Sequence, residues 1–199
     1  MAEASEKRVF LAGEGKNELG SWAAEKEYQS DSQAGVLKVL LHQKKPAGWK
    51  ICGATQWKNI RKYKTGDHNE PEIRNIFGAC QMARDAGCDC IAFSRDTDGS
   101  AVRQREIEQG ILDAPKAISN LPGLIGACAI PVIEAWVLAI ADLQGTEKLS
   151  TVAAKEKCKK MGNQSTDELV AFIEKSGITK IPSDAYGLNS WLALAEKTL

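Results

Sequence analysis

The chain has 199 residues, of which 43% are hydrophobic and 26% are charged, and its 26 basic side chains are balanced by 26 acidic ones. These proportions are typical of a globular protein, and zero net charge neither favours nor excludes a polyanionic partner. No apolar stretch reaches the roughly 18 residues that a membrane-spanning helix needs, and the first residues do not have the pattern of a signal peptide. We therefore expect a cytoplasmic protein without a membrane partner.

The first half of the chain is predicted to alternate strands with helices. Residues 8–13 (RVFLAG) are typical of a buried strand, and a tight turn is predicted at residues 14–15, where Gly15 follows Glu14. Residues 17–26 then form a helix. In residues 35–43 the apolar side chains recur at helical spacing, which favours a helix. Residues 49–57 are predicted to form a second strand, kinked at its glycine.

The second half continues the alternation. A proline at the first turn and a glycine past the end indicate a helix over residues 71–86. A strand at residues 89–94 is followed by an acidic turn and by a long helix over residues 101–120, strained near its proline. Residues 124–130 form the fourth strand and residues 131–143 the next helix. Shorter helices are expected from there to the end.

Strands that alternate with helices predict an α/β fold in which a mostly parallel sheet is sandwiched by helices. Residues 1–145 would form the main, catalytic domain. Residues 146–199 would form a small helical extension packed on it. The sequence contains no internal repeat and no low-complexity segment.

The cysteines predict no zinc site. No Cys-x-x-Cys pair is present, and the chain has only two histidines, so ligands for zinc are scarce. We expect reduced, mostly buried thiols in a reducing compartment. The six cysteines are Cys52, Cys80, Cys88, Cys90, Cys128 and Cys158.

Carboxylates follow three of the predicted strands at or near their ends. Glu14 comes directly after the first strand, Asp96 and Asp98 after the third, and Glu134 one turn into the helix after the fourth. Ligands of parallel sheets bind at the carboxyl ends of the strands, and convergent carboxylates need a cation. Oxygen ligands select Mg²⁺ or Mn²⁺. Alternatively, the two aspartates only cap the next helix, and Glu18 is expected to be a solvated helix residue.

A basic run is the second feature of the sequence. Positive side chains without any acidic neighbour extend over residues 44–64, with aromatic residues between them, and such a pattern is typical of nucleic-acid binding. A solvated charged face is an equally good explanation. The run comprises Lys44, Lys45, Lys50, Lys58, Arg61, Lys62 and Lys64, and Arg95 beside the acidic turn is a further candidate for phosphate binding. A second basic cluster comprises Lys155, Lys157, Lys159 and Lys160.

These segments resemble the TOPRIM domain of type IA and type II topoisomerases, bacterial primases and OLD-family nucleases. The similarity lies in the strand with its Glu-Gly in VFLAGEGKNE and in the strand with its D-x-D in IAFSRDTDG. The segment IPVIEAWVLAIAD is similar to the P-x-x-E-x-W-L-x-A-D signature of small TOPRIM-like bacterial proteins, some of them encoded beside ATPases in phage-defence loci. The resemblance extends over residues 8–142.

The resemblance implies roles for four carboxylates. Glu14 would be a general acid/base or metal ligand, Asp96 and Asp98 would form the metal-binding D-x-D, and Glu134 would be the additional carboxylate of the narrower family. Many topoisomerase and primase members carry a third aspartate where this chain has Ser100. That difference argues against topoisomerase chemistry.

The function expected from the sequence is Mg²⁺- or Mn²⁺-dependent hydrolysis of phosphodiester bonds in DNA or RNA by a nuclease of bacterial defence. One alternative is a subunit that works only with an ATPase partner, for which exposed Trp22 and Trp191 would suit an interface. Another is a small-molecule phosphohydrolase. A homo-oligomer is compatible with all three.

Overall fold

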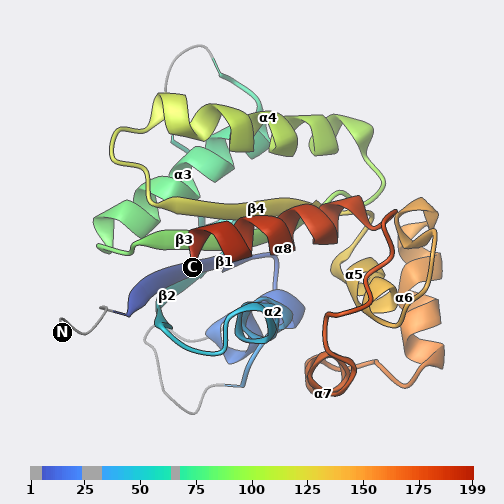
Figure 1. The fold of residues 1–199 in the computed structure, drawn as a ribbon. Coiled ribbons are helices and arrows are strands. Elements are labelled where there is room, and N and C mark those ends of the chain that lie inside the picture. Colours follow the sequence, from blue (N-terminus) through green and yellow to red (C-terminus); the bar gives the residue numbers. More distant parts are fainter. Residues whose placement is uncertain (1–5, 24–32, 64–67) are drawn as a thin grey trace.

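Four parallel strands form the central sheet of the protein, in the order β2-β1-β3-β4 (Figure 1). The computed structural model describes residues 6–23, 33–63 and 68–199. The strands are β1 (Lys7–Gly13), β2 (Trp49–Gln56), β3 (Cys90–Asp96) and β4 (Gly123–Ala129). Helices cover both faces of the sheet, so the predicted α/β fold is confirmed.

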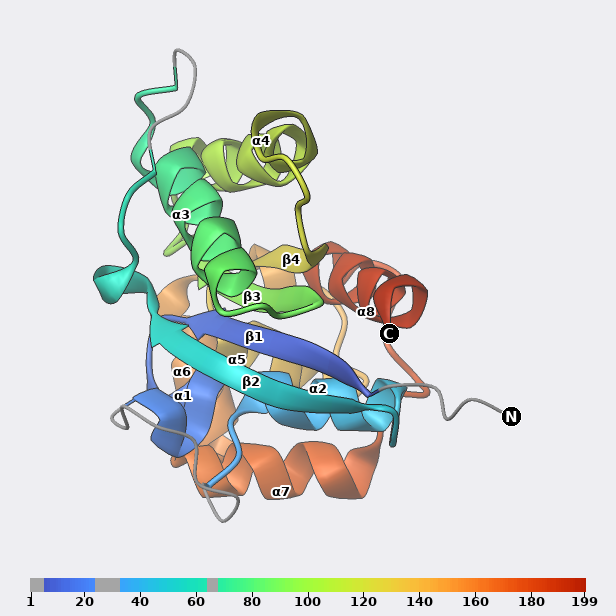
Figure 2. The ribbon, with the colours of Figure 1, turned by 90° about the vertical axis from the view of Figure 1, so that its left-hand side faces the viewer.

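The two faces of the sheet carry separate cores. Helices α3 (Pro71–Asp85) and α4 (Ala101–Ala117) cover one face, where Phe77 and Phe93 are fully buried. The helices on the other face, several of which lie below the sheet in Figure 2, bury a second core that contains Trp136. They are α1 (Lys16–Leu19), α2 (Val36–Lys44), α5 (Ile133–Ile140), α6 (Thr151–Lys160), α7 (Thr166–Ser176) and α8 (Tyr186–Thr198). Three short 3₁₀ turns are η1 (Gly20–Ala23), η2 (Trp57–Asn59) and η3 (Thr146–Lys148).

The first helix is shorter than predicted. It ends at Leu19 because Gly20 adopts a left-handed φ of 67°, and a Cβ atom there would lie 2.0 Å from the carbonyl oxygen of Gln33. Only glycine accepts this conformation and this close approach without strain. The chain continues as η1 to Ala23, and residues 24–26 of the predicted helix lie outside the described residues.

The C-terminal helices share a core with the sheet. Trp191 of α8 is completely buried, and its indole nitrogen donates a hydrogen bond of 2.9 Å to the carbonyl oxygen of Phe93 in β3. Trp22 is 5% exposed. The prediction that these two tryptophans form an exposed interface is therefore wrong, because both fill space beneath the sheet. Within the described part of the chain, no helix is long and apolar enough to cross a membrane.

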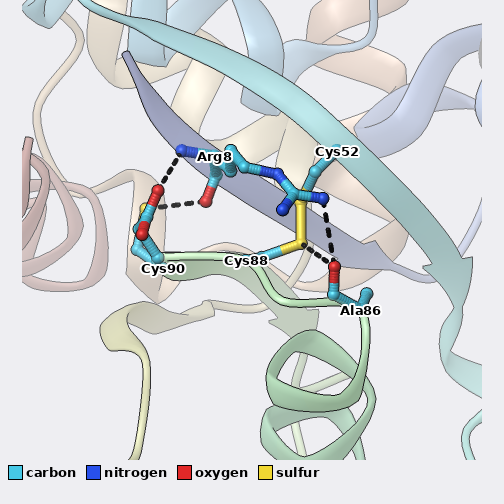
Figure 3. The surroundings of a disulfide bond; sticks show 6 residues. Arg8, Cys52, Ala86, Cys88 and Cys90 are labelled. Atoms are coloured by element: carbon cyan, nitrogen blue, oxygen red, sulfur yellow. Dashed lines mark hydrogen bonds between the residues drawn. A yellow bond between two sulfur atoms is a disulfide. The ribbon is translucent and has the colours of Figure 1, made fainter. Parts of the chain in front are cut away.

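A disulfide joins Cys52 to Cys88, so the prediction of reduced thiols is wrong for this pair (Figure 3). Cys52 is the extra residue of a bulge in β2, because Val9 and Phe10 of β1 pair with the residues on either side of it. Cys88 lies just before β3, and the two Cα atoms are 6.4 Å apart. The disulfide thereby connects the two segments that flank β1. The remaining four cysteines are buried free thiols.

Candidate functional site

An acidic cavity of about 360 Å³ lies at the carboxyl ends of β1 and β3. Three of its carboxylates come from the predicted set: Glu14 follows β1, Asp96 is the last residue of β3, and Glu134 is in the first turn of α5. A fourth, Glu18, comes from α1. The lining residues of this acidic cavity are Glu14, Gly15, Lys16, Asn17, Glu18, Asp96, Ile133, Glu134 and Lys155.

Asp96 is a strongly perturbed carboxylate of the cavity. It is 7% exposed, and its Oδ1 accepts a hydrogen bond of 2.9 Å from the backbone nitrogen of Ile133. Burial, reinforced by the negative charges of Glu18, Glu134 and Asp98, raises the pKa of Asp96 to about 8. The charged form is therefore disfavoured unless a cation neutralises it.

Glu18 belongs to this group although the sequence predicted a solvated side chain. It is 4% exposed, and its Oε2 accepts a hydrogen bond of 2.8 Å from the backbone nitrogen of Gly15. Burial raises the pKa of Glu18, and the nearby Glu134 raises it further. The prediction failed because the tight turn at Gly15 folds the short helix α1 back over the end of β1, which turns Glu18 inward.

Glu134 has one satisfied oxygen and one unsatisfied oxygen. Its Oε1 accepts a hydrogen bond of 3.2 Å from the Asn17 side chain, and Thr166 of α7 donates to Asn17 in turn at 3.0 Å. Its Oε2 is buried and has no hydrogen-bond partner among the described residues. A buried carboxylate oxygen without a partner carries a large desolvation cost. Lys155 of α6 lines the same cavity, where its positive charge lowers the pKa of Glu18.

Two predicted carboxylates are paired with arginines instead. Arg95 forms an ion pair with Glu14, and Arg103 lies 2.5 Å from Asp98. Both arginines also contact the buried carboxylate of Glu72, Arg95 at 2.8 Å and Arg103 at 3.3 Å. Burial is the main cause that lowers the pKa of Arg95, to about 10. The buried Glu72 thus contacts two arginines, and each arginine pairs with a carboxylate that the sequence had predicted for the site.

The structure does not place Asp98 in the acidic cavity. Strand β3 ends at Asp96, and Asp98 is an exposed residue with a left-handed φ of 50°. The expectation that Asp96 and Asp98 point the same way assumed an extended segment. The turn that begins after Asp96 removes that alternation, and Asp98 lies beside Arg103 outside the cavity lining.

The basic run is divided between opposite ends of β2. Lys44 pairs with Glu196, Lys45 donates to the carbonyl oxygen of Leu199, and Lys50 pairs with Glu6, all near the start of the strand. Lys50 is the second residue of β2, so six further strand residues, roughly 20 Å at 3.3 Å per residue, lie between it and the second group. The second group, at the end of β2 beside the acidic cavity, comprises Lys58, Arg61 and Lys62. Lys64 lies outside the described residues.

A second pocket of about 470 Å³ adjoins the acidic cavity, and Glu14 lines both. We call it the basic pocket because lysine and arginine side chains dominate its charge. Trp57 lies in its wall, 5% exposed, with the guanidinium of Arg95 5.5 Å from its ring centroid. The lining residues of the basic pocket are Glu14, Trp57, Lys58, Ile60, Lys62, Asn75 and Arg95.

The cavity fits a divalent cation in the chemistry of its residues, but it is not a preformed cage. Carboxylate oxygens suit Mg²⁺ and Mn²⁺, and the unpartnered Oε2 of Glu134 and the raised pKa of Asp96 both indicate missing positive charge. In this side-chain arrangement no group of three His, Cys, Asp or Glu residues in the described part of the chain is close enough to hold a metal ion. Side-chain rotation of Glu18, Asp96 and Glu134 would have to complete the site.

Comparisons of the chain with protein-family models, with curated proteins and with solved structures returned no match. The function must therefore be argued from the acidic cavity and the basic pocket themselves.

Proposed function

We propose that this protein is a divalent-metal-dependent phosphodiesterase that cleaves nucleic acid, a nuclease of the TOPRIM-like type. The observation that carries the proposal is the cluster of Glu18, Asp96 and Glu134, which are buried together at the carboxyl end of a parallel sheet without enough positive charge. Buried carboxylates in such a group are stable when a cation is bound among them.

Glu18, Asp96 and Glu134 are the residues that would hold Mg²⁺ or Mn²⁺. The bound ion would polarise a phosphate oxygen and lower the pKa of a water molecule, which is the chemistry that phosphodiester hydrolysis requires. Ile133 fixes the orientation of the Asp96 carboxylate through its backbone nitrogen, and Asn17 fixes that of Glu134. Each bond engages one oxygen, Oδ1 of Asp96 and Oε1 of Glu134, so the second oxygen of each carboxylate would bind the ion.

Other residues of the acidic cavity and the basic pocket would bind the substrate or take part in proton transfer. Lys155 lines the cavity and provides a positive charge for a phosphate oxygen. Glu14, at the boundary between the acidic cavity and the basic pocket, is in a position to accept a proton from the attacking water. Its ion pair with Arg95 keeps a positive charge next to the carboxylate and restrains its rotation. Lys58 and Lys62 extend the positive surface along the path of a nucleic-acid backbone.

The basic pocket favours nucleic acid over the alternative of an ATPase-dependent subunit. The argument for a protein interface came from two tryptophans that the structure buries. By contrast, the basic pocket beside the acidic cavity carries Lys58, Lys62 and Arg95, and such positive side chains suit a polyanion.

The test is cleavage of plasmid DNA, single-stranded DNA and RNA by the purified protein with Mg²⁺, with Mn²⁺ and with EDTA. Asp96→Asn and Glu134→Gln should abolish metal-dependent cleavage. The matched control is Glu174→Gln, which changes an exposed carboxylate on α7 and should cleave as the unmodified protein does. Absence of cleavage of all three substrates by the folded, metal-supplied protein would refute the proposal.

A further inference from the structure

The segment after η2, which carries Lys62 of the basic pocket, is held in place before any ligand binds. The segment after η2 is fixed against α3 by a hydrogen bond of 3.1 Å from the backbone nitrogen of Tyr63 to the carbonyl oxygen of Arg74. Gly78 permits this approach, because a Cβ atom at that position would lie 2.1 Å from the carbonyl oxygen of Arg61. Lys62 is therefore carried on a restrained backbone rather than on a free loop.

The positive side chains of the basic pocket have charges and N–H donors that no described residue of the protein uses. Lys58 and Lys62 form no ion pair with any carboxylate in the described part of the chain. Arg95 uses its Nε and one hydrogen of each terminal nitrogen on Glu14 and Glu72. A guanidinium has five N–H groups, so one hydrogen on each terminal nitrogen is left without a protein acceptor among the described residues. These donors are available to an anion.

The pocket selects by charge and not by base stacking. Trp57 is buried, with Arg95 over its ring and Phe93 tilted against it at 5.5 Å between centroids. Its indole nitrogen is already bound to Glu72 at 2.7 Å. A ring that is only 5% exposed and already covered by Arg95 does not offer a surface for stacking on a base. A phosphate group is the part of a nucleotide that the free donors fit.

We infer that the basic pocket binds the terminal phosphate of a nucleic-acid strand. An inner phosphodiester carries one negative charge, whereas a phosphomonoester carries about −1.5 to −2 at neutral pH. Lys58 and Lys62, which form no ion pair in the described part of the chain, supply two positive charges, and these match the phosphomonoester better than the inner phosphodiester.

The position of the pocket links end recognition to cleavage, and this step rests on the proposed function. Glu14 lines both the basic pocket and the acidic cavity. A terminal phosphate in the basic pocket brings the next phosphate of the strand to the acidic cavity. There water adds to phosphorus, one P–O bond breaks, and the leaving oxygen takes up a proton, so a nucleotide is released from the strand end.

Binding without turnover tests the inference independently of catalysis. One short labelled single strand is prepared with a 5′-phosphate, with a 3′-phosphate and with hydroxyl groups at both ends. Fluorescence polarisation with Asp96→Asn protein in EDTA measures the three affinities. One phosphorylated form is expected to bind at least about tenfold more tightly than the hydroxyl form, since it gains charge-assisted bonds. The phosphorylated form that gains affinity identifies which strand end is recognised.

Two double variants, made in the Asp96→Asn protein, locate the effect. Lys58→Ala with Lys62→Ala should reduce the ratio of affinities to about one, whereas Lys175→Ala with Lys180→Ala, which removes two exposed lysines of the C-terminal region, should preserve it. Equal affinities for all three strands, or equal losses in the two double variants, would overturn the inference. If cleavage fails but the ratio persists, only the proposed function falls; if cleavage occurs with a ratio of one, only the end recognition falls.

Discussion

Replacement of Asp96 by asparagine is expected to stabilise the metal-free protein. Asparagine keeps an oxygen that can accept the hydrogen bond from Ile133, and it removes the negative charge that is buried beside Glu18 and Glu134. The variant should therefore lose the cost of the buried charge while the start of α5 stays in place. Loss of activity combined with a gain in stability is the signature of a residue that the fold itself does not need.

The magnitude follows from the pKa of Asp96, which rises from 3.8 to about 8 on folding. Because the folded protein holds a proton that the unfolded chain has released, the free energy of unfolding falls as the pH rises between these two values. Each pKa unit corresponds to about 1.4 kcal/mol. Near pH 8 the raised pKa of Asp96 thus lowers the free energy of unfolding of the original protein by about 5 kcal/mol relative to acidic pH. This loss is absent from Asp96→Asn.

Urea denaturation from pH 4.5 to pH 8.5 in EDTA measures this difference. The free energy of unfolding of Asp96→Asn should exceed that of the unmodified protein by a margin that widens with pH. Mg²⁺ should stabilise the unmodified protein, by about 2.7 kcal/mol when it is present at a hundred times its dissociation constant, and should leave the variant unchanged. Glu174→Gln is the control and should follow the unmodified protein. An Asp96→Asn protein that is no more stable than its parent at pH 8 would refute the reasoning.

Three further predictions follow from other parts of the site and the fold. Lys155→Ala should lower the rate of nucleic-acid cleavage by roughly 10²-fold, as expected for loss of a donor to a phosphate oxygen, while Lys159→Ala on the same helix should have no effect in the same assay. Glu72→Gln should lower the free energy of unfolding by about 3 kcal/mol in urea denaturation, because the two arginines that it holds lose a buried counter-ion; an unchanged value would show that the network is not stabilising. Cys52→Ser should lower it by up to about 4 kcal/mol, from the 36-residue separation between Cys52 and Cys88, and dithiothreitol should reproduce that loss in the parent but have no effect on the variant.

Much of the fold was predictable because local signals agreed with one another. The alternation of strands and helices, the proline at the start of α3 and the helical spacing in α2 each appear in the structure where the sequence placed them. The convergence of Glu14, Asp96 and Glu134 followed from one rule about parallel sheets. The division of the basic run was also within reach, since a predicted strand stood between its two halves.

Other features depended on contacts between distant segments. Lys155 reaches the acidic cavity because α6 packs on α5, and no spacing in the sequence connects the two. Glu72 lies in a helix that carried no motif, yet it organises both arginines. Glu18 did have a signal: a glycine three residues before a glutamate at a helix start has the spacing of a capping box, which brings the glutamate back toward the turn.

The burial of Trp191 has a consequence for how the protein comes into being. Synthesis proceeds from the N-terminus, so all four strands leave the ribosome before α8, and until then the sheet lacks the side chain that fills its lower face. The carboxylates that we assign to the metal site are made earlier, whereas Lys155 and the helix that closes the core come later. A nascent or prematurely terminated chain therefore has the acidic residues without the folded cavity. The proposed activity would therefore begin only after α8 has been synthesised and has packed against β4.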